Sequence, residues 1–323
     1  MIDINNLSNG MIINSGELNV LVKSAEKKTT KSDKPFIIGQ FSTRDGEIQF
    51  KIWDDKLKSL NMENFDEIIA ERTKLGTPMI LSIEGKVEDF NGLYINVSNF
   101  SEIDGNISDY ICPEITEEQY ENLVSKLRDY IKQIKNVEYK NLVNIIFADA
   151  IFKERFFNSA AAYKNHHNYF HGLLKHTVEV LDYAIALYDA NPREDIDRDL
   201  IIVGALLHDI GKTEEYISSE FSTLYNDFSL GHLVSGVSII MHILGKNISK
   251  TNTIENGYCL SIKDKEISIS NSTLNKVFKI INLHHGPYEG DKMSKSFNQA
   301  VKDLGIPEIV YIFAADMVSS QTI

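Results

Sequence analysis

The sequence predicts an α+β protein of two domains, a five-stranded β-barrel followed by an all-helical domain with a small inserted β-hairpin. Residues 11–104 form short apolar segments that alternate like strands and are separated by turn residues, whereas most of the remainder has helical periodicity. All nine histidines lie between His166 and His285. We therefore divide the chain into domains 1–108 and 109–323 and expect the chemistry in the second.

The bulk composition is that of an ordinary globular protein, with 323 residues of which 43% are hydrophobic and 24% charged. The opening residues MIDINNLSNG lack the pattern of a signal peptide, and no stretch of about 18 apolar residues follows. We expect a cytoplasmic protein without a membrane partner, and a homo-oligomer is compatible with the sequence. Cys112 and Cys259 are far apart, which argues against a disulfide framework or a thiolate zinc site.

The net charge of -13 has the wrong sign for a protein that holds nucleic acid mainly by neutralising phosphates. A substrate that carries phosphate would need local help. Divalent metal ions in a pocket of carboxylates and imidazoles could supply it, and so could a local cluster of lysines.

Five segments rich in β-branched and aromatic residues predict the strands of the first domain: Glu17–Lys23, Phe36–Ser42, Glu47–Trp53, Met79–Val87 and Leu93–Phe100. Two predicted tight hairpins, at Arg44–Glu47 and Asp89–Gly92, place glycine where a positive φ is useful. Residues near 55–75 predict a short helix. Five strands with a helix after the third is the order of an OB-fold barrel.

The predicted loop between the first two strands is rich in lysine, with Lys23, Lys27, Lys28, Lys31 and Lys34. OB folds often grip single strands there, and Phe41, Phe50, Trp53 or Tyr94 could offer stacking surfaces for bases. We take Lys27, Lys28, Lys31 and Trp53 as candidate substrate-binding residues. The alternative is a solvated loop above a barrel whose aromatic residues, among them Phe41, Phe50 and Tyr94, are mostly core.

The second domain follows a linker near Gly105–Pro113. Thr116–Gln119 has the form of a capping box that opens a helix through about Asn136. Tyr258–Ser270 predicts the inserted β-hairpin, with a turn at Lys263–Lys265.

The most informative stretch is Gly204–Lys212, which reads GALLHDIGK. It predicts a buried apolar helix that ends in a glycine cap at Gly211, with His208 and Asp209 side by side in its last turn. Both side chains can reach a cation between them. An imidazole with a carboxylate suits a borderline-hard divalent ion such as Mn²⁺ or Fe²⁺.

Two further inward-facing polar residues are predicted on other helices. Asp316 shares a helix face with Ile309 and Ile312, and His176 shares one with Leu173 and Val180. A buried carboxylate needs a partner, which is a metal ion or, alternatively, a lysine or arginine. A single inward histidine is more often a satisfied core residue, so His176 gains weight only from the other two signals.

These motifs resemble the HD phosphohydrolase superfamily, and within it the YhaM-type 3′→5′ exoribonucleases, which also carry an N-terminal OB domain. The resemblance spans almost the whole chain and rests on His166-His167-x-Tyr169, Gly172-Leu173-Leu174-x-His176-Thr177, Leu206–Thr213, Gly231-His232 and His284-His285-Gly286. It implies an HD-superfamily metal-dependent phosphodiesterase domain behind the barrel.

The resemblance also implies a ligand set for one or two ions. His176, His208, Asp209 and Asp316 would form the first site, and His232, His284 and His285 would extend it, with Asp209 as a bridge. Which of His284 and His285 is a ligand stays open. Mn²⁺ is the ion we favour, and Fe²⁺, Co²⁺, Ni²⁺ and Mg²⁺ remain alternatives.

Catalytic roles are implied for Asp209, Lys212 and His232, with Lys212 meeting a substrate phosphate. The alternative for Lys212 is to stabilise the end of a helix dipole. His166, His167 and His171 would contact a phosphate or leaving group, or else belong to a solvated loop. His242 aligns with an exposed helix face, and we exclude it.

The sequence departs from this family after His285-Gly286, where Pro287–Lys292 replaces a loop containing Trp-Gly, and in the inserted hairpin. We expect these differences to bear on substrate choice rather than on metal binding.

The resulting hypothesis is a metal-dependent 3′→5′ exonuclease in which the OB domain grips single-stranded RNA, or DNA, and the HD domain cleaves it. The first alternative is a hydrolase of small nucleotides or of cyclic or short oligonucleotides, because HD sites serve those substrates too. A second is a non-catalytic single-strand binding protein.

Overall fold

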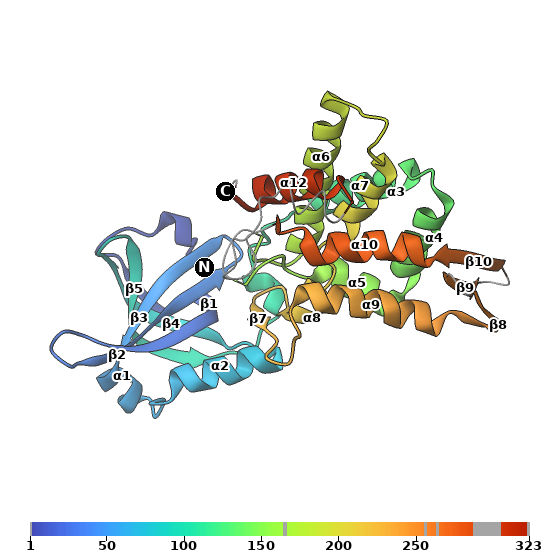
Figure 1. Cartoon of the computed structure of the whole chain (residues 1–323). Helices are drawn as coiled ribbons and strands as arrows, with labels where there is room; N and C mark the ends of the chain where they lie inside the picture. Colours follow the sequence, from blue (N-terminus) through green and yellow to red (C-terminus); the bar gives the residue numbers. More distant parts are fainter. Residues whose placement is uncertain (1, 164–166, 255–256, 263–264, 287–304, 322–323) are drawn as a thin grey trace. The chain divides into compact units, whose positions relative to one another are not determined.

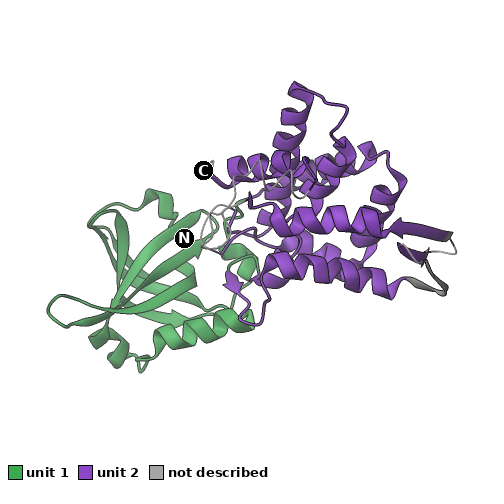
Figure 2. Cartoon of the chain, in the orientation of Figure 1, with its two compact units in different colours: residues 1–114, 219–222 green, residues 115–218, 223–323 purple. Residues whose placement is uncertain are grey.

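The computed structural model describes residues 2–163, 167–254, 257–262, 265–286 and 305–321 (Figure 1). The chain forms two compact units (Figure 2). Unit 1 comprises Met1–Glu114 with Ser219–Ser222, and unit 2 comprises Ile115–Ser218 with Thr223–Ile323.

Unit 1 is a closed barrel with the strand order β1-β2-β3-β5-β4, in which β1 also pairs with β4. Its strands are β1 (Ile12–Thr29), β2 (Pro35–Thr43), β3 (Gly46–Trp53), β4 (Ile80–Asp89) and β5 (Leu93–Glu102). Helices α1 (Asp54–Ser59) and α2 (Phe65–Leu75) lie between β3 and β4, and 3₁₀ turns occupy Ile4–Asn6 and Ile107–Tyr110. This is the strand order and helix position of an OB fold, as the sequence predicts.

Strand alternation explains the barrel core. In β3 the side chains of Ile48, Phe50 and Ile52 are buried, while their neighbours face outward. The ring of Phe41 stacks on Phe50 with centroids 3.9 Å apart, so these two aromatics belong to the core. Their burial confirms the core alternative and excludes Phe41 and Phe50 as a base-stacking surface.

Both predicted hairpins form with their glycines at positive φ. Gly46 at the start of β3 has a φ of 145° and Gly92 before β5 has a φ of 122°. These backbone conformations are costly for any residue with a Cβ, which explains glycine at both turns.

The predicted lysine-rich loop is shorter than expected. Lys23, Lys27 and Lys28 lie in β1, and only residues 30–34, which include Lys31, connect β1 to β2. The prediction was wrong because the polar half of β1 is held by backbone pairing with β2, as in the pairs of Lys28 with Phe36 and Thr29 with Pro35, and needs no apolar alternation.

Unit 2 is mainly helical. Its helices are α3 (Glu117–Gln133), α4 (Val137–Ala148), α5 (Ala150–Asn158), α6 (Gly172–Ala190), α7 (Arg198–Leu207), α8 (Lys212–Glu215), α9 (His232–Lys246), α10 (Asn271–Leu283) and α12 (Ile309–Gln321). The predicted capping box is present at the start of α3, where Thr116 and Gln119 exchange hydrogen bonds. Asn136 begins α4 as its N-cap instead of ending α3.

Two small sheets interrupt the helices. Strands β6 (Tyr216–Ser218) and β7 (Thr223–Tyr225) form one, and β8 (Ile248–Ile254), β9 (Gly257–Ile262) and β10 (Lys265–Ser270) form the other in the order β10-β9-β8. The predicted hairpin is the antiparallel pair β9 and β10. Strand β8 was not predicted, and residues 263–264 of the predicted turn lie outside the described residues.

Helix α7 is the centre of unit 2. Every residue from Leu200 to Leu207 is buried, and the helix packs against α6, α10 and α12. Gly204 permits this packing, since a Cβ there would lie 2.4 Å from Cδ1 of Ile312 and 3.0 Å from Cδ1 of Ile280. The close approach brings the C-terminal end of α7 among the three neighbouring helices.

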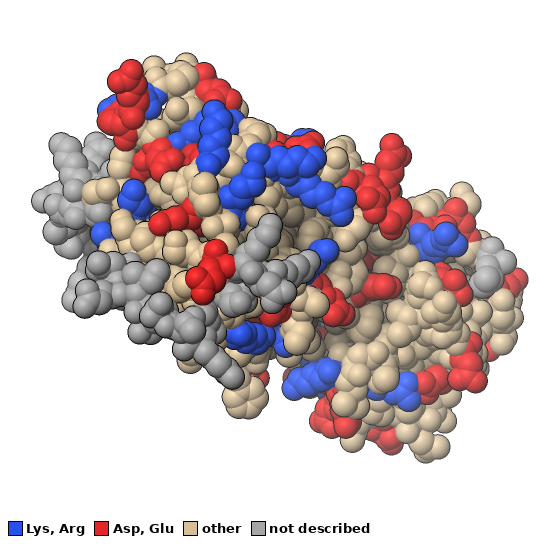
Figure 3. Space-filling model, turned by 90° about the vertical axis from the view of Figure 1, so that its right-hand side faces the viewer, with Lys and Arg blue, Asp and Glu red and all other residues tan. Residues whose placement is uncertain are grey.

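Among the described residues, no helix combines the length and apolar character that crossing a bilayer requires. Basic and acidic side chains are interspersed on the face shown in Figure 3, where lysines and arginines gather in one short band.

Candidate metal centre

The structure brings all seven predicted metal-ligating residues of unit 2 together as two groups that share Asp209. The first group is His176, His208, Asp209 and Asp316, and the second is Asp209, His232, His284 and His285. In each group the potential ligand atoms lie within 4.8 Å of one another.

The first group is assembled from three elements. His176 comes from α6, Asp316 from α12, and His208 and Asp209 from the turn between α7 and α8. Nε2 of His176 lies 3.2 Å from Oδ2 of Asp209, 3.2 Å from Oδ1 of Asp316 and 3.2 Å from Nε2 of His208. No lysine or arginine pairs with Asp316 among the described residues, so the alternative of a salt bridge to such a residue finds no support in this part of the chain.

The second group lies on the other oxygen of Asp209. Oδ1 of Asp209 is 3.4 Å from Nε2 of His284 and 3.8 Å from Nε2 of His232. Nε2 of His232 is in turn 3.4 Å from Nε2 of His285. Both histidines of the His284-His285 pair therefore reach the group, and Asp209 presents one oxygen to each group.

Hydrogen bonds behind the imidazoles decide which ring nitrogen carries a proton. Nδ1 of His208 lies 2.9 Å from the carbonyl oxygen of Ala205, and Nδ1 of His284 lies 2.8 Å from that of Ile281. Because a carbonyl oxygen only accepts, both Nδ1 atoms donate. In the neutral rings Nε2 then carries a lone pair, and both lone pairs face Asp209.

Two glutamates stand behind the rings of His232 and His176. Nδ1 of His232 donates to Oε2 of Glu215 at 2.7 Å. The hydroxyl of Ser319 donates to Oε2 of Glu179 at 2.8 Å, so its oxygen accepts from Nδ1 of His176 at 3.0 Å. A carboxylate or hydroxyl behind a histidine is the usual device for fixing a metal-ligating tautomer.

A divalent cation fits this donor set. Both carboxylate oxygens of Asp209 and Nε2 of His284 are buried without a hydrogen bond to any described residue, although Oδ2 of Asp209 forms an ion pair with Lys212. Such groups cost several kcal/mol unless an ion or proton satisfies them. Imidazole nitrogens mixed with carboxylate oxygens suit Mn²⁺ and similar borderline-hard ions, and these seven residues are the ones that would hold them.

The electrostatics of the site favour a cation. Burial would raise the pKa of the Asp209 carboxyl, but Lys212 and His208 outweigh it and hold the pKa well below its usual value. Burial would lower the pKa of His176, but Asp209 and Asp316 outweigh it and raise the pKa. At His284 burial dominates and lowers the pKa to about 4, so that ring is neutral and able to ligate.

Lys212 is the positively charged neighbour of the two groups. Its Nζ lies 2.5 Å from Oδ2 of Asp209, and its side chain is 11% exposed. Lys212 is the first residue of the short helix α8. Its ammonium contacts the carboxylate of Asp209, which both groups share, and not the C-terminal end of a helix as in the predicted alternative.

Gly211 differs from its predicted role. Its φ of -66° is helical, so it is not a left-handed helix cap. The turn needs glycine for space, since a Cβ on Gly211 would lie 1.8 Å from the carbonyl oxygen of His232 and 2.6 Å from the nitrogen of Gly236. This approach sets the start of α9, and with it His232, against the turn that carries Asp209.

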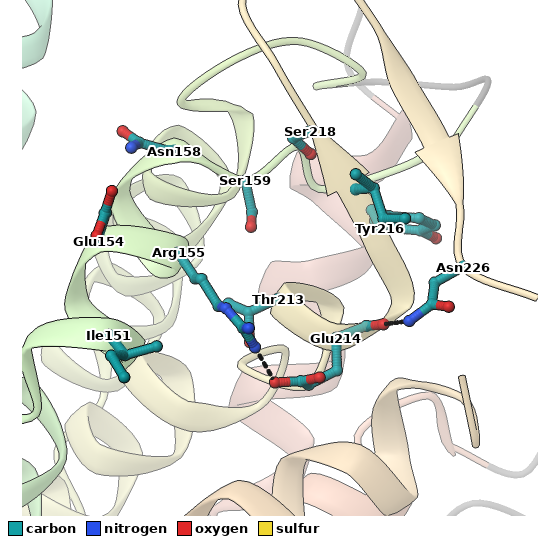
Figure 4. A pocket seen from close by; sticks show the side chains of 11 residues that line it. Ile151, Glu154, Arg155, Asn158, Ser159, Thr213, Glu214, Tyr216, Ser218 and Asn226 are labelled. Carbon is teal, nitrogen blue, oxygen red and sulfur yellow. Dashed lines mark hydrogen bonds and ion pairs between the residues drawn. The ribbon is translucent and has the colours of Figure 1, made fainter. Parts of the chain in front are cut away.

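The outer side of α8 is anchored independently of the metal centre (Figure 4). Glu214 pairs with Arg155 of α5, and its carbonyl oxygen accepts a hydrogen bond from Asn226 at 2.8 Å. A cavity of about 410 Å³ lies on this side, lined among others by Thr213 and Tyr216. These contacts hold α8 in place, and its last residue, Glu215, orients His232.

The predicted substrate-binding histidines are mostly engaged within the protein. His167 is 8% exposed and hydrogen-bonds to Tyr169 and Glu179, while Nδ1 of His171 donates to the carbonyl of Phe157 at 2.6 Å. His166 lies outside the described residues, as does Pro287–Lys292. His242, which we excluded, is exposed on α9.

Strand pairing places some of the predicted barrel residues on one outer face. Lys28 pairs with Phe36, which pairs with Trp53, and directly paired residues share a face. Nζ of Lys51, on the same face, lies 3.8 Å from the ring centroid of Trp53 and 4.3 Å from that of Phe36. We call Lys28, Phe36, Lys51 and Trp53 the aromatic row. Lys27 points to the opposite side, and Lys31 is exposed in the β1–β2 connection.

Sequence reasoning missed Glu179, Glu215 and Ser319, which touch histidines rather than a metal. A weak signal was available in spacing. Glu179 follows His176 by three residues, and Ser319 follows Asp316 by three, so each shares a helix face with a predicted ligand.

Comparison with protein families agrees with the helical unit 2. The HD domain family model matches residues 173–319. The chain is also similar to the second OB-fold domain of replication protein A from Methanococcus maripaludis, with 19% identity over 33% of this chain and 97% of that one and a TM-score of 0.22. The OB-fold assignment itself rests on the strand order of the barrel. The protein therefore combines an N-terminal OB-fold barrel with an HD domain, the domain of metal-dependent phosphohydrolases.

Proposed function

We propose that this protein is a metal-dependent 3′→5′ exonuclease that hydrolyses phosphodiester bonds of single-stranded RNA, and to some extent of single-stranded DNA. The observation that carries the proposal is the pair of four-residue groups that meet at Asp209 within an HD domain. A barrel with a partly exposed aromatic and basic face accompanies this centre, which favours a strand over a mononucleotide as substrate.

Divalent ions at such a centre supply Lewis-acid stabilisation of a phosphate and make water a better nucleophile near neutral pH. The chain's own contribution is to hold the donors. Asp209 presents an oxygen to each group, and Glu215 and Ser319 fix the rings of His232 and His176. Because the site is buried, these electrostatic interactions are stronger than they would be in water.

Lys212 is proposed to stabilise charge on the substrate phosphate. Its Nζ is already at the edge of the centre, 2.5 Å from Asp209, and its side chain retains 11% exposure. A lysine ammonium acts as a point charge on phosphate oxygens and has three donors, so it can contact both the carboxylate and a substrate oxygen.

The aromatic row is proposed to hold the substrate strand. Phe36 and Trp53 are half-buried with ring centroids 5.6 Å apart, and Lys51 lies over both rings. Bases stack on such aromatic faces while lysines meet the backbone phosphates, and both contacts tolerate any sequence. Lys28 at the end of the same row extends the basic edge.

The polarity and the RNA preference follow from the resemblance to YhaM-type exoribonucleases. The imidazole and carboxylate donors support Mn²⁺ as the ion. A substrate role is also proposed for His166, His167 and His171. Both ring nitrogens of His167 and Nδ1 of His171 are hydrogen-bonded within unit 2, so of these two residues Nε2 of His171 is the ring atom that could contact a phosphate.

The proposal is tested by incubating the full chain with 5′-labelled single-stranded RNA and its DNA counterpart, with Mn²⁺ or with EDTA. We expect products shortened stepwise from the 3′ end with Mn²⁺ only, faster for RNA. Hydrolysis confined to mononucleotides or cyclic dinucleotides would show a small-nucleotide enzyme instead. Strand binding without any hydrolysis would show a binding protein.

The role of the aromatic row is tested separately with Trp53→Ala. Loss of one stacking contact should weaken binding of a single strand by about 1–3 kcal/mol, or roughly 5–150-fold. Hydrolysis of a small phosphodiester such as bis-p-nitrophenyl phosphate should be unchanged. Leu75→Ala is the control, since Leu75 is 69% exposed on α2 of the same unit and is not one of the four residues of the row. Equal strand affinity in Trp53→Ala and wild type would exclude the row.

A further inference from the structure

Side chains of α12 contact both ring nitrogens of His176, which belongs to α6. Asp316 and Ser319 lie three residues apart on α12, and they contact Nε2 and Nδ1 of His176 respectively. His176 and Glu179 lie three residues apart on α6, so the carboxylate of Glu179 stands behind the ring. The packing of the two helices thus places Ser319 between His176 and Glu179.

The donor and the acceptor of each hydrogen bond between His176, Ser319 and Glu179 can be assigned. Oε2 of Glu179 accepts from the Ser319 hydroxyl at 2.8 Å and from Nε2 of His167 at 3.0 Å. The hydroxyl of Ser319 has a single proton, which it donates in the hydrogen bond to Glu179. Oγ of Ser319 therefore acts as the acceptor for Nδ1–H of His176. In the neutral ring with its proton on Nδ1, Nε2 of His176 has a lone pair that faces Asp209 and Asp316, as metal binding requires.

Glu179 is built to remain an acceptor. Burial would raise the pKa of its carboxyl, but the hydrogen bonds from His167 and Ser319 outweigh burial and lower the pKa. His167 reaches it from a backbone with a φ of 56°, a conformation that costs a residue with a side chain about 1 kcal/mol or more. Gly172 allows that conformation, since a Cβ there would lie 2.1 Å from the carbonyl oxygen of His167.

We propose that Glu179 is a positioning residue for the first group, acting through Ser319 to keep His176 in the tautomer that can bind a metal ion. His167 belongs to the same device, because it holds the carboxylate of Glu179 in place. Glu215 orients His232 by a direct hydrogen bond, whereas Glu179 orients His176 through Ser319. The inference rests on the metal centre of the proposed function and not on its substrate.

Replacing Glu179 by leucine removes the acceptor and frees the Ser319 proton. Ser319 can then donate to Nδ1 of His176, which puts the ring proton on Nε2, where a metal ion has to displace it. Replacing Glu179 by glutamine keeps an oxygen that can accept from Ser319. Loss of an outer hydrogen-bond partner typically weakens metal binding by about 10–100-fold.

The test uses the full-length chain as Glu179→Leu, Glu179→Gln and Ser319→Ala. Mn²⁺ affinity is measured by isothermal titration, and the ligand geometry by the visible spectrum of the Co²⁺-loaded protein. Glu138→Leu is the matched control, since Glu138 also accepts from two hydroxyl groups, those of Ser270 and Thr273, at the start of α10. Melting temperatures without metal report the stability cost of each change.

We expect Glu179→Leu and Ser319→Ala to lose about 10–100-fold in Mn²⁺ affinity and to alter the Co²⁺ spectrum. Glu179→Gln should retain most of the Mn²⁺ affinity. Glu138→Leu should keep the wild-type Mn²⁺ affinity and Co²⁺ spectrum, although it lowers the melting temperature about as much as Glu179→Leu does. Wild-type affinity and spectrum in both Glu179→Leu and Ser319→Ala would overturn the positioning role. Failure of the wild type to bind any divalent ion would instead overturn the metal centre itself.

Discussion

Gly211→Ala is predicted to disrupt the second group of ligands and to leave the first group intact. The added Cβ would lie 1.8 Å from the carbonyl oxygen of His232, and a normal contact requires the start of α9 to withdraw by about 1 Å or more. Ligand distances at a metal site tolerate only about 0.2 Å, so His232 should be lost as a ligand. His176, His208 and Asp316 come from other elements and should stay in place.

The cost in stability can be bounded as well. Overpacking of this kind destabilises by about 1–3 kcal/mol, which for a domain of this size lowers the melting temperature by roughly 2–4 °C per kcal/mol. Gly245→Ala is the control on the same helix, because a Cβ there meets nothing within 4 Å. An alanine at an unobstructed helical position should be neutral or stabilise by up to about 1 kcal/mol.

The assay is titration of the metal-free protein with Mn²⁺, followed by the melting temperature. The wild type and Gly245→Ala should bind two ions, and Gly211→Ala should bind one and melt lower. Two ions bound with wild-type affinity by Gly211→Ala, together with an unchanged melting temperature, would refute the close approach of α9 to the turn.

Three further predictions follow from the geometry. Asp209→Asn keeps the side-chain shape but removes the charge that both groups share, so Mn²⁺ titration should show both ions lost and the strand assay no turnover; binding of either ion at wild-type affinity would contradict the bridge. His242→Ala should leave Mn²⁺ affinity and turnover unchanged, because His242 is exposed on α9 and outside both groups; a loss of either would mean that the ligand set is incomplete. Thr116→Ala removes the side chain that caps α3 and should lower the free energy of unfolding by about 1 kcal/mol in a denaturant titration, with no change in Mn²⁺ affinity.

Much of the fold could be predicted because its signals are local. The alternation in β3, the glycine turns at Gly46 and Gly92 and the capping box at Thr116 each depend on a few neighbouring residues. The polar end of β1 could not be predicted in the same way. Its strand conformation depends on backbone pairing with β2, which no side-chain pattern reports.

The candidate site divides along the same line. Residues that carry the metal chemistry, such as His208 and Asp209, stand out by residue type on an apolar helix. Glu179 and Ser319 do not, because a glutamate and a serine are ordinary on any helix surface and gain meaning only where α6 meets α12. The reason for glycine at position 211 also required the neighbouring helix α9.

We expect each of the two groups that share Asp209 to bind one metal ion. Anomalous diffraction at the manganese absorption edge, from crystals of the full chain grown with Mn²⁺, tests it most directly. We predict two anomalous peaks, one beside Oδ2 among His176, His208 and Asp316, and one beside Oδ1 among the histidines of the second group. Peaks elsewhere in the molecule, with none beside Asp209 in Mn²⁺-saturated crystals, would contradict it.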